Sequence, residues 1–472
     1  MNSEPAAPAR TAVSKAVRPY QRAAVVVATS LGVVLAGSVP ASAQGSGPGS
    51  ADPGSIAEAP RAAVAGLPSA SVAGLAYLGG SVPLAGVLGS LDAAGSGEFD
   101  RPGSSAPPSE PVATRDTSIK TTEVRGVEPL YPDNNDPEFA RAEVWTVASA
   151  TMQREVRVEV YRAPGRYSAA PIVYFLDGVG SEKPSGWSGG MGFGSPNLRD
   201  KAMTVVAPTG APASMWADWN EDDPVLGPNQ WETFLTKELP PLLEKGQEET
   251  AGVEAVEPVP FSKALRYGVV GISMGGGPAL RLANKHPDMF GGAGAVSGCF
   301  STMDDLGYQN TRLTVESRGG DVENLWGPRG SEQWRENDTV LDPSGLDGQR
   351  VYMSAATGLI GSTDLLHFGP NPTVMADGHL LEKGSYECTR ALENSLTEAG
   401  IEHRVDYDPT GIHNWPVFIP RITNATEYIL PGLGEPVLAP VRAAAGAGGA
   451  GPLGSAGSLG SLGSTGGSGS GS

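Results

Sequence analysis

The chain has 472 residues and a formal net charge of −19, and its 65 glycines and 41 prolines are concentrated toward the two ends. The length has room for two or three domains, but the glycine- and proline-rich ends favour one sizeable globular domain. The acidic charge argues against nucleic-acid binding, which needs a basic face, and is typical of a soluble protein that avoids anionic lipid surfaces.

The N-terminal region has the pattern of an export signal. Basic residues precede the apolar stretch 23–37, and the small residues Ala41, Ser42 and Ala43 follow it. This order predicts a signal peptide over residues 1–43, cleaved before Gln44, and hence a secreted protein. The apolar stretch has 15 residues, fewer than the roughly 20 that span a bilayer. An uncleaved anchor is the alternative.

Two segments have low sequence complexity. Residues 44–118 are rich in Ala, Gly, Ser and Pro, and residues 433–472 end in GSLGSTGGSGSGS. Such segments bury too little apolar surface to offset the entropy lost on ordering. We therefore expect a low-complexity segment over 44–118, a globular domain over 119–432, and a flexible Gly/Ser-rich tail over 433–472.

Strand and helix patterns alternate within the expected domain. In chain order they predict strands over 153–163, 171–179 and 202–210, a helix over 230–245, a strand over 265–273, a helix over 276–285, strands over 291–298 and 350–358, a helix over 386–400, and a strand over 403–408. Short apolar runs that end in turns are typical of buried parallel strands. The alternation predicts an α/β fold with a mostly parallel central sheet flanked by helices.

A Gly-x-Ser-x-Gly turn spans residues 271–275, between a predicted strand and a predicted helix. Glycine tolerates the backbone angles of such a cramped turn, which lifts the serine hydroxyl out of the sheet. The motif alone is a weak signal in a chain this rich in glycine and serine. In its strand–turn–helix context, with a histidine late in the chain, it predicts the α/β-hydrolase fold with Ser273 as nucleophile.

The general base can be chosen from only five histidines. In this fold the triad follows the chain order serine, acid, histidine. His413 lies after the last predicted strand and before a predicted C-terminal helix, where the fold delivers its base. His286 ends a predicted helix and His403 begins a strand, while His367 and His379 fall in a predicted polar loop. We therefore expect His413 to be the base.

The triad acid is predicted from loop position. Asp364 is the first carboxylate after the strand 350–358, in the loop where this fold places its acid. Asp377 and Glu382 are competing candidates, and Asp364 could instead cap a helix or lie in a solvated loop. The prediction is therefore a triad of Ser273, Asp364 and His413.

The oxyanion hole of this fold needs two backbone amides. One comes from the residue after the nucleophile, Met274, and the other from the loop that follows an earlier strand, which makes Val179 the expected donor. Asp177 stands at the same rim, where a carboxylate could bind a sugar hydroxyl or simply form the turn before Gly178. The chain has no cysteine and histidine spacing of the zinc type, so we expect no metal and no cofactor.

The chain has two cysteines, Cys299 and Cys388. In an exported protein an isolated pair favours a disulfide over a metal site, with two free buried thiols as the alternative. Closing so long a loop would stabilise the fold by up to about 4–5 kcal/mol in the chain-entropy model.

Several longer blocks occur in a fixed order along the chain. They are LDGVGSEKPSGW, QWETFLTKELP, GISMGGGPALRLANKHPDMFGGAGAVSG, LWGPRGSEQWRENDT and GIHNWPVF. Together they resemble the mycolyltransferases of the antigen 85 group, and more closely their relatives in corynebacteria and allied actinobacteria. The resemblance covers roughly residues 128–430 and is far more specific than the serine turn alone.

The resemblance implies an α/β-hydrolase that moves a mycolyl group from trehalose monomycolate to a second trehalose monomycolate or to arabinogalactan in the cell envelope. It matches Ser273 to the family nucleophile, His413 to the base, and Met274 and Val179 to the oxyanion amides. Asp364 falls near the family acid, which is a glutamate in the mycobacterial members.

The resemblance also implies a trehalose pocket lined by Asp177, Asn414 and Trp415. The Trp415 indole could be a sugar platform or a packed core side chain. Gly180 stands where the mycobacterial enzymes carry an arginine, which bears on the trehalose contacts and on acceptor choice. The pair of Cys299 and Cys388 looks like one found in the corynebacterial branch.

Two other functions are compatible with the sequence. A secreted carboxylesterase or protein O-acyltransferase would keep the chemistry and change the acceptor, and Gly180 motivates this alternative. A wall-associated binding or adhesion protein with vestigial catalysis would suit the low-complexity ends, but the intact serine, base and turn argue against it.

Overall fold

The computed structural model describes residues 114–440, apart from residues 182, 189–191, 194–195 and 250–254. The predicted signal peptide, most of the low-complexity segment and residues 441–472 of the tail lie outside the described residues. Within the described part of the chain, no helix has both the length and the apolar composition to cross a membrane.

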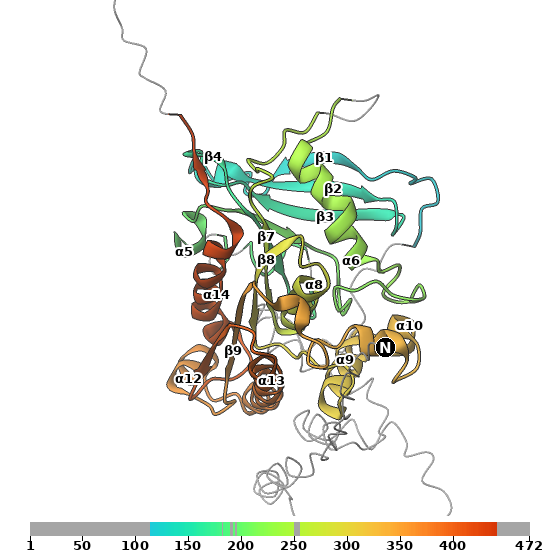
Figure 1. The fold of residues 1–472 in the computed structure, drawn as a ribbon, viewed down its shortest axis with the longest axis vertical. Helices are drawn as coiled ribbons and strands as arrows, with labels where there is room; N and C mark the ends of the chain where they lie inside the picture. The colour runs from blue at the N-terminus through green and yellow to red at the C-terminus, as the bar shows by residue number, and fades with distance from the viewer. Residues whose placement is uncertain (1–113, 182, 189–191, 194–195, 250–254, 441–472) are drawn as a thin grey trace, which may run out of the picture.

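A nine-stranded sheet forms the centre of the molecule (Figure 1), in the order β1-β2-β3-β6-β5-β7-β8-β9-β10. The strands are β1 (Glu123–Pro129), β2 (Ala142–Ser149), β3 (Arg154–Tyr161), β5 (Ile172–Leu176), β6 (Thr204–Pro208), β7 (Tyr267–Ile272), β8 (Phe290–Val296), β9 (Arg350–Ala356) and β10 (His403–Asp408). Strands β1 to β3 pair antiparallel with one another and β3 pairs antiparallel with β6, whereas all pairs from β6 to β10 are parallel. The predicted mostly parallel sheet is confirmed, and its order is that of an α/β-hydrolase.

The helices connect and cover these strands. They are α5 (Pro196–Arg199), α6 (Trp231–Thr233), α7 (Leu239–Lys245), α8 (Gly276–Lys285), α9 (Asp305–Ser317), α10 (Val322–Trp326), α11 (Glu332–Glu336), α12 (Ser362–Phe368), α13 (Pro372–Ala399) and α14 (Trp415–Ile429). A π-helical stretch, Phe234–Glu238, joins α6 to α7. In Figure 1, α12 and α13 lie together at one end of the molecule, while α6 lies near the antiparallel strands.

The two faces of the sheet bury two separate apolar cores. Successive side chains of a strand point to opposite faces, so Val269 and Val270 of β7 belong to different cores. Val269 packs in the cluster that contains Leu280 of α8, and Val270 packs in the cluster that contains Ile429 of α14. Helices α8 and α14 therefore pack against β7 from opposite faces of the sheet.

The domain boundaries differ from the prediction at both ends. Arg115, assigned to the low-complexity segment, forms an ion pair with Asp222. Leu433, assigned to the tail, is fully buried. The strand β11 (Val437–Leu438), also assigned to the tail, pairs with β4 (Tyr167–Ala169) of the predicted domain. The folded part therefore begins before residue 119 and continues past residue 432.

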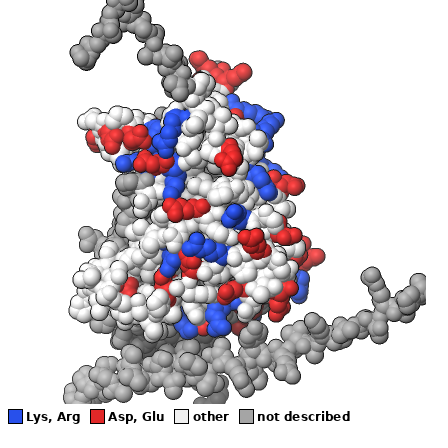
Figure 2. Space-filling view, turned by 60° about the vertical axis from the view of Figure 1, so that its left-hand side comes forward, with Lys and Arg blue, Asp and Glu red and all other residues white. Residues whose placement is uncertain are grey.

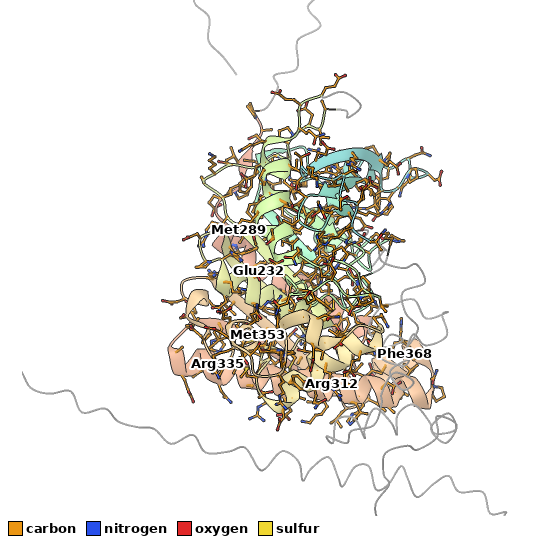
Figure 3. The ribbon with its side chains drawn as sticks, turned by 90° about the vertical axis from the view of Figure 1, so that its right-hand side faces the viewer. Glu232, Met289, Arg312, Arg335, Met353 and Phe368 are labelled. Carbon is orange, nitrogen blue, oxygen red and sulfur yellow. A yellow bond between two sulfur atoms is a disulfide. The ribbon has the colours of Figure 1, made fainter. Side chains whose placement is uncertain are left out.

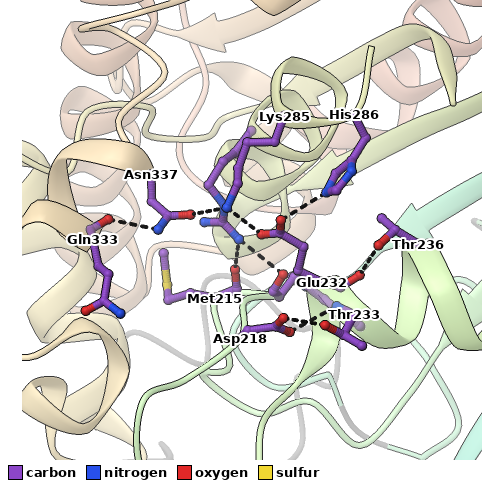
Figure 4. A network of polar contacts seen from close by, with 11 residues as sticks. Met215, Asp218, Glu232, Thr233, Thr236, Lys285, His286, Gln333 and Asn337 are labelled. Carbon is purple, nitrogen blue, oxygen red and sulfur yellow. Dashed lines mark hydrogen bonds and ion pairs between the residues drawn. The ribbon is translucent and has the colours of Figure 1, made fainter. Parts of the chain in front are cut away.

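A partly buried polar network ties α6 to α8 (Figure 4). The Glu232 carboxylate lies 2.9 Å from His286 Nε2 and accepts from Lys285 Nζ at 2.9 Å. Arg281, also on α8, donates to the carbonyl oxygens of Met215 and Trp216. Burial alone raises the pKa of Glu232, but the His286 hydrogen bond and the charges of Lys285 and Arg281 outweigh it and lower that pKa to about 2.

This shift predicts a pH-dependent stability. A carboxyl group whose pKa is lowered by folding stabilises the protein above its unfolded pKa, and this contribution is lost as the pH falls through the folded pKa. We expect Glu232→Gln to lower the free energy of unfolding by about 2–3 kcal/mol at pH 7. The deficit should shrink as the pH falls from about 4.5 toward about 2. Urea unfolding at pH 7, 5 and 3 measures it, and the exposed Glu332→Gln provides the control. A deficit that does not change with pH would contradict this assignment.

Candidate active site

Ser273 sits at the tip of the turn that follows β7, at a backbone φ of 51°. This left-handed conformation is rare for a residue with a side chain and is found where a fold holds a reactive group in place. A Cβ atom at Gly271 would lie 2.0 Å from the Gly275 carbonyl oxygen, and one at Gly275 would lie 2.4 Å from the Leu176 carbonyl oxygen. Both glycines are therefore required by close backbone contacts within the turn and against β5.

His413 lies in the loop between β10 and α14 and meets this serine. Its Nε2 is 2.8 Å from Ser273 Oγ, as the sequence predicted for the base. The ring is 3% exposed and contacts Phe418 edge-on, and the His413 amide donates to the Gly378 carbonyl oxygen. These contacts fix the orientation of the imidazole toward the hydroxyl.

The carboxylate bonded to His413 is Glu382, so the prediction of Asp364 as the triad acid is wrong. Glu382 Oε2 lies 2.7 Å from His413 Nδ1, and the Glu382 side chain is fully buried. The serine, histidine and glutamate thus form a continuous chain of hydrogen bonds, which is the arrangement of a serine acyl-transfer triad. Of the three acids weighed from the sequence, the structure places this one beside the base.

Asp364 has a structural position instead. It is the third residue of α12, where its Oδ2 accepts a hydrogen bond from the Gly361 amide at 2.7 Å. Its Oδ1 lies 3.4 Å from the Ile412 amide nitrogen and 3.4 Å from Asn414 Nδ2. The helix-capping alternative is therefore the one observed, and the buried carboxylate helps to hold the loop that carries His413.

The acid was misassigned because the first half of α13 was interpreted as a polar loop. The sequence predicts a helix only over 386–400, whereas α13 begins at Pro372. Gly378 disfavours a helix interior, but a Cβ there would lie 2.9 Å from Ile412, so glycine allows α13 to pack closely on the histidine loop. Tertiary packing therefore overrides local propensity here, and it carries Glu382 to the site on a helix.

Two donors hold the other oxygen of Glu382. Oε1 accepts from Ser297 Oγ at 2.8 Å and from the Ala356 amide at 2.7 Å, which leaves Oε2 for His413. Ser297 follows β8 at a φ of 53°, and its own carbonyl oxygen accepts from Ser385 of α13. Nothing in the sequence pattern distinguished Ser297 from other serines, because its role depends on a contact across 85 residues.

We expect Ser297→Ala to lower kcat about 10-fold with little change in KM, because it removes a donor that orients Glu382. Ser297→Gly is the matched variant, since it removes the same hydroxyl but relieves the left-handed backbone. Equal losses of kcat, with the glycine variant the more stable in urea unfolding, would support the positioning role. A wild-type kcat for Ser297→Ala would contradict it.

A pocket opens beside Ser273 Oγ and contains the predicted oxyanion residues. Val179 and Met274 line it together with Ser273 and His413, and its remaining lining comes from the segment that follows β8, from α9 and from α13. The close approach of Gly275 to the carbonyl oxygens of Leu176 and Asp177 sets the serine turn against the end of β5. This contact explains how two segments far apart in sequence meet at one pocket.

The residues predicted to bind sugar are buried, and none of the three is among the described residues that line this pocket. Asp177 is 5% exposed, and its carboxylate accepts from the amides of Gly178 and Gly186, both at 2.8 Å. Asn414 is fully buried, and Trp415 is 1% exposed with its ring edge-on to Trp187. Trp415 therefore takes the packed-core alternative, and the three side chains offer little exposed polar surface to a ligand.

The predicted disulfide is present, joining Cys299 to Cys388. Cys299 lines the pocket beside the serine turn, and Cys388 lies on α13, the helix that carries Glu382. The bond therefore ties the helix of the acid to the segment that follows β8. Among the described residues no group of acids, histidines and cysteines is arranged to hold a metal ion.

Comparisons with known proteins agree with this geometry. The chain matches the family model Esterase ("Putative esterase") over residues 149–429, more than half of its length. The diacylglycerol acyltransferase/mycolyltransferase Ag85A of Mycobacterium gordonae is 28% identical over 318 residues, which cover 64% of this chain and 84% of that protein. The Ag85B protein of Mycobacterium avium is 30% identical over 280 residues, which cover 57% of this chain and 72% of that protein.

A solved structure is also similar, that of Mycobacterium tuberculosis MPT51 (FbpC1). It is 25% identical, with a TM-score of 0.49, over 62% of this chain and 99% of that one. The match to the family model and the coverage of the Ag85 relatives confirm the resemblance found in the sequence blocks. The chain belongs to the Esterase family and, within it, to the Ag85 family of acyltransferase enzymes.

Proposed function

We propose that this protein transfers a mycolyl group from trehalose monomycolate, through an ester on Ser273, to a second trehalose monomycolate or to arabinogalactan. The observation that carries the proposal is the hydrogen-bond chain from Ser273 through His413 to Glu382. The names of the Ag85 relatives supply the acyl group, since a triad alone does not define a substrate.

The triad would perform the reaction in two halves. Ser273 Oγ attacks the ester carbonyl carbon while its proton passes to His413 Nε2, and Glu382 stabilises the imidazolium through Nδ1–H. The amides of Val179 and Met274 would stabilise the oxyanion of the tetrahedral intermediate. When the intermediate collapses, the leaving sugar oxygen takes the proton from His413 and the acyl group stays on Ser273.

The second half reverses these steps with a new alcohol. A sugar hydroxyl gives its proton to His413 Nε2 and attacks the acyl-enzyme, which releases the new ester and restores Ser273. Water competes for the same carbonyl carbon, so transfer requires that the acceptor displace it from the pocket. The predicted export signal and the envelope location of these acceptors support a secreted, envelope-associated enzyme.

A carboxylesterase is the second candidate, favoured by the burial of the predicted sugar contacts. The Asp177 carboxylate is held by the amides of Gly178 and Gly186, Asn414 and Trp415 are buried, and Gly180 offers no side chain to a sugar. If no other groups hold the acceptor, water would take the acyl group instead.

The test is to incubate the purified protein with labelled trehalose monomycolate and separate the lipid products, with Ser273→Ala as the blank. Trehalose dimycolate formed only by the intact serine is the expected result. Free mycolic acid alone, in the presence of sugar acceptors, would favour the esterase. Labelling of Ser273 by a fluorophosphonate without turnover of this donor would show that the triad is competent and the donor is wrong.

A further inference from the structure

Four large apolar side chains stand exposed on one short segment of the surface. Leu359 is 57% exposed and Ile360 46% in the loop after β9, and Leu365 is 49% and Leu366 87% exposed on α12. We call these four residues the Leu366 patch. Helix α12 follows the loop directly, so the four side chains lie within a few residues of one another. Figure 3 shows Phe368, the last residue of α12, at the edge of the molecule.

The patch adjoins the structure that forms the active site. The Leu359 carbonyl oxygen accepts a hydrogen bond from the Gly411 amide at 2.7 Å, and Gly411 lies two residues before His413. The Gly358 carbonyl oxygen lies 2.8 Å from His379 Nδ1 on α13, close in sequence to Leu381, which lines the pocket. The patch is therefore anchored to both segments that deliver the base and the acid.

The chain segment that bears the patch carries almost no exposed charge. Residues 357–381 contain only two charged side chains, Asp364 and Asp377, and each is 1% exposed. The next charged side chain on α13, Glu382, is fully buried beside His413, and Lys383 after it is paired with Glu387 at 2.6 Å. The side that bears α12 comes forward in Figure 2, where the lower left is mostly uncharged. A chain with a net charge of −19 thus keeps one apolar, uncharged sector next to its catalytic residues.

We propose that the Leu366 patch docks on the surface of an electrically neutral lipid layer and brings the pocket to its acyl donor. The inference rests on the proposed function, in which the donor carries long acyl chains. Exposed apolar groups gain free energy on entering the lipid interface, and contiguous patches of this kind mark interaction sites. The acidic remainder of the surface is repelled by anionic headgroups, which selects a neutral layer.

The test compares vesicle flotation of the full chain with that of the variant Leu365→Ser/Leu366→Ser. The control is Leu341→Ser, because Leu341 is similarly exposed, at 53%, in a separate part of the chain. We expect the wild-type protein and the control to float with phosphatidylcholine vesicles, and the patch variant to bind at least about 10-fold more weakly. Adding phosphatidylglycerol should weaken binding of all three, and hydrolysis of a soluble p-nitrophenyl butyrate should be equal in all three.

Equal flotation of the patch variant and the wild type would overturn the inference, as would stronger binding to anionic vesicles. Sedimentation of the wild-type chain as a dimer that the patch variant abolishes would assign the patch to a second copy instead. The binding assay does not depend on transfer, so the two proposals fail separately. Patch-dependent binding without formation of trehalose dimycolate would support the docking and count against the proposed transfer. Transfer with patch-independent binding would support the proposed function and overturn the docking.

Discussion

Glu382→Gln is expected to lower kcat for acyl transfer by about 10⁴-fold, because an amide at this position favours the wrong histidine tautomer. The wild-type carboxylate lies 2.7 Å from His413 Nδ1 and cannot donate a hydrogen bond, so it holds the proton on Nδ1 and leaves Nε2 free to accept from Ser273. Glutamine can donate to Nδ1 and place the proton on Nε2, facing the serine. Single-turnover kinetics with a soluble chromogenic ester would measure the loss at the acylation step.

Asp364→Asn is the matched comparison, since it makes the same chemical change at the acid that the sequence favoured. Asp364 caps α12 and does not contact the His413 ring in the described structure. We expect kcat within about threefold of wild type and a loss of stability of about 1 kcal/mol. A larger loss of kcat in Asp364→Asn than in Glu382→Gln would assign the catalytic role to Asp364 and contradict the arrangement at His413.

Removal of the disulfide should cause the largest loss of stability. The bond joins Cys299 to Cys388 across 89 residues. In the chain-entropy model, closing a loop of this size lowers the entropy of the unfolded chain and so stabilises the fold by about 4–5 kcal/mol. We expect the double variant Cys299→Ser/Cys388→Ser to lose about 3–5 kcal/mol in urea unfolding, with an unfolding midpoint reduced accordingly.

Two controls separate the crosslink from the side chains. Wild-type protein unfolded in the presence of reductant should show the same loss as the double variant, and the double variant should not respond to reductant. Fluorophosphonate labelling of Ser273 should persist in the double variant under native conditions, because no thiol takes part in the chemistry. A loss below about 1 kcal/mol would mean that strain or residual structure cancels the effect of the crosslink.

The serine and the histidine of the site were predictable because their signals are local. Close backbone contacts require glycine at positions 271 and 275. The turn can therefore be recognised from residues that are adjacent in the sequence. His413 follows β10 (His403–Asp408), whose bounds the sequence pattern predicted. Helix α8 (Gly276–Lys285) also has its predicted bounds, since it starts at the turn and ends before Pro287.

The strands β1 and β2 and the helices α9 to α12 were not predicted, and neither was the first half of α13. The first half of α13 depends on a partner far away in the chain, since its Gly378 packs on Ile412. A glycine at this position disfavours the helix that the structure contains.

Residue type and order along the chain were enough to predict the α/β-hydrolase class, the serine turn, the histidine that meets it and the cysteine pair. The carboxylate that contacts His413, the bond from Ser297 to that carboxylate and the burial of Trp415 became visible only in the folded structure. Glu382, Asp377 and Asp364 are equivalent as carboxylates in a sequence, and their difference arises from which one a helix delivers to within 2.7 Å of His413. That distance is set by packing between segments remote in the chain, which local propensity does not encode.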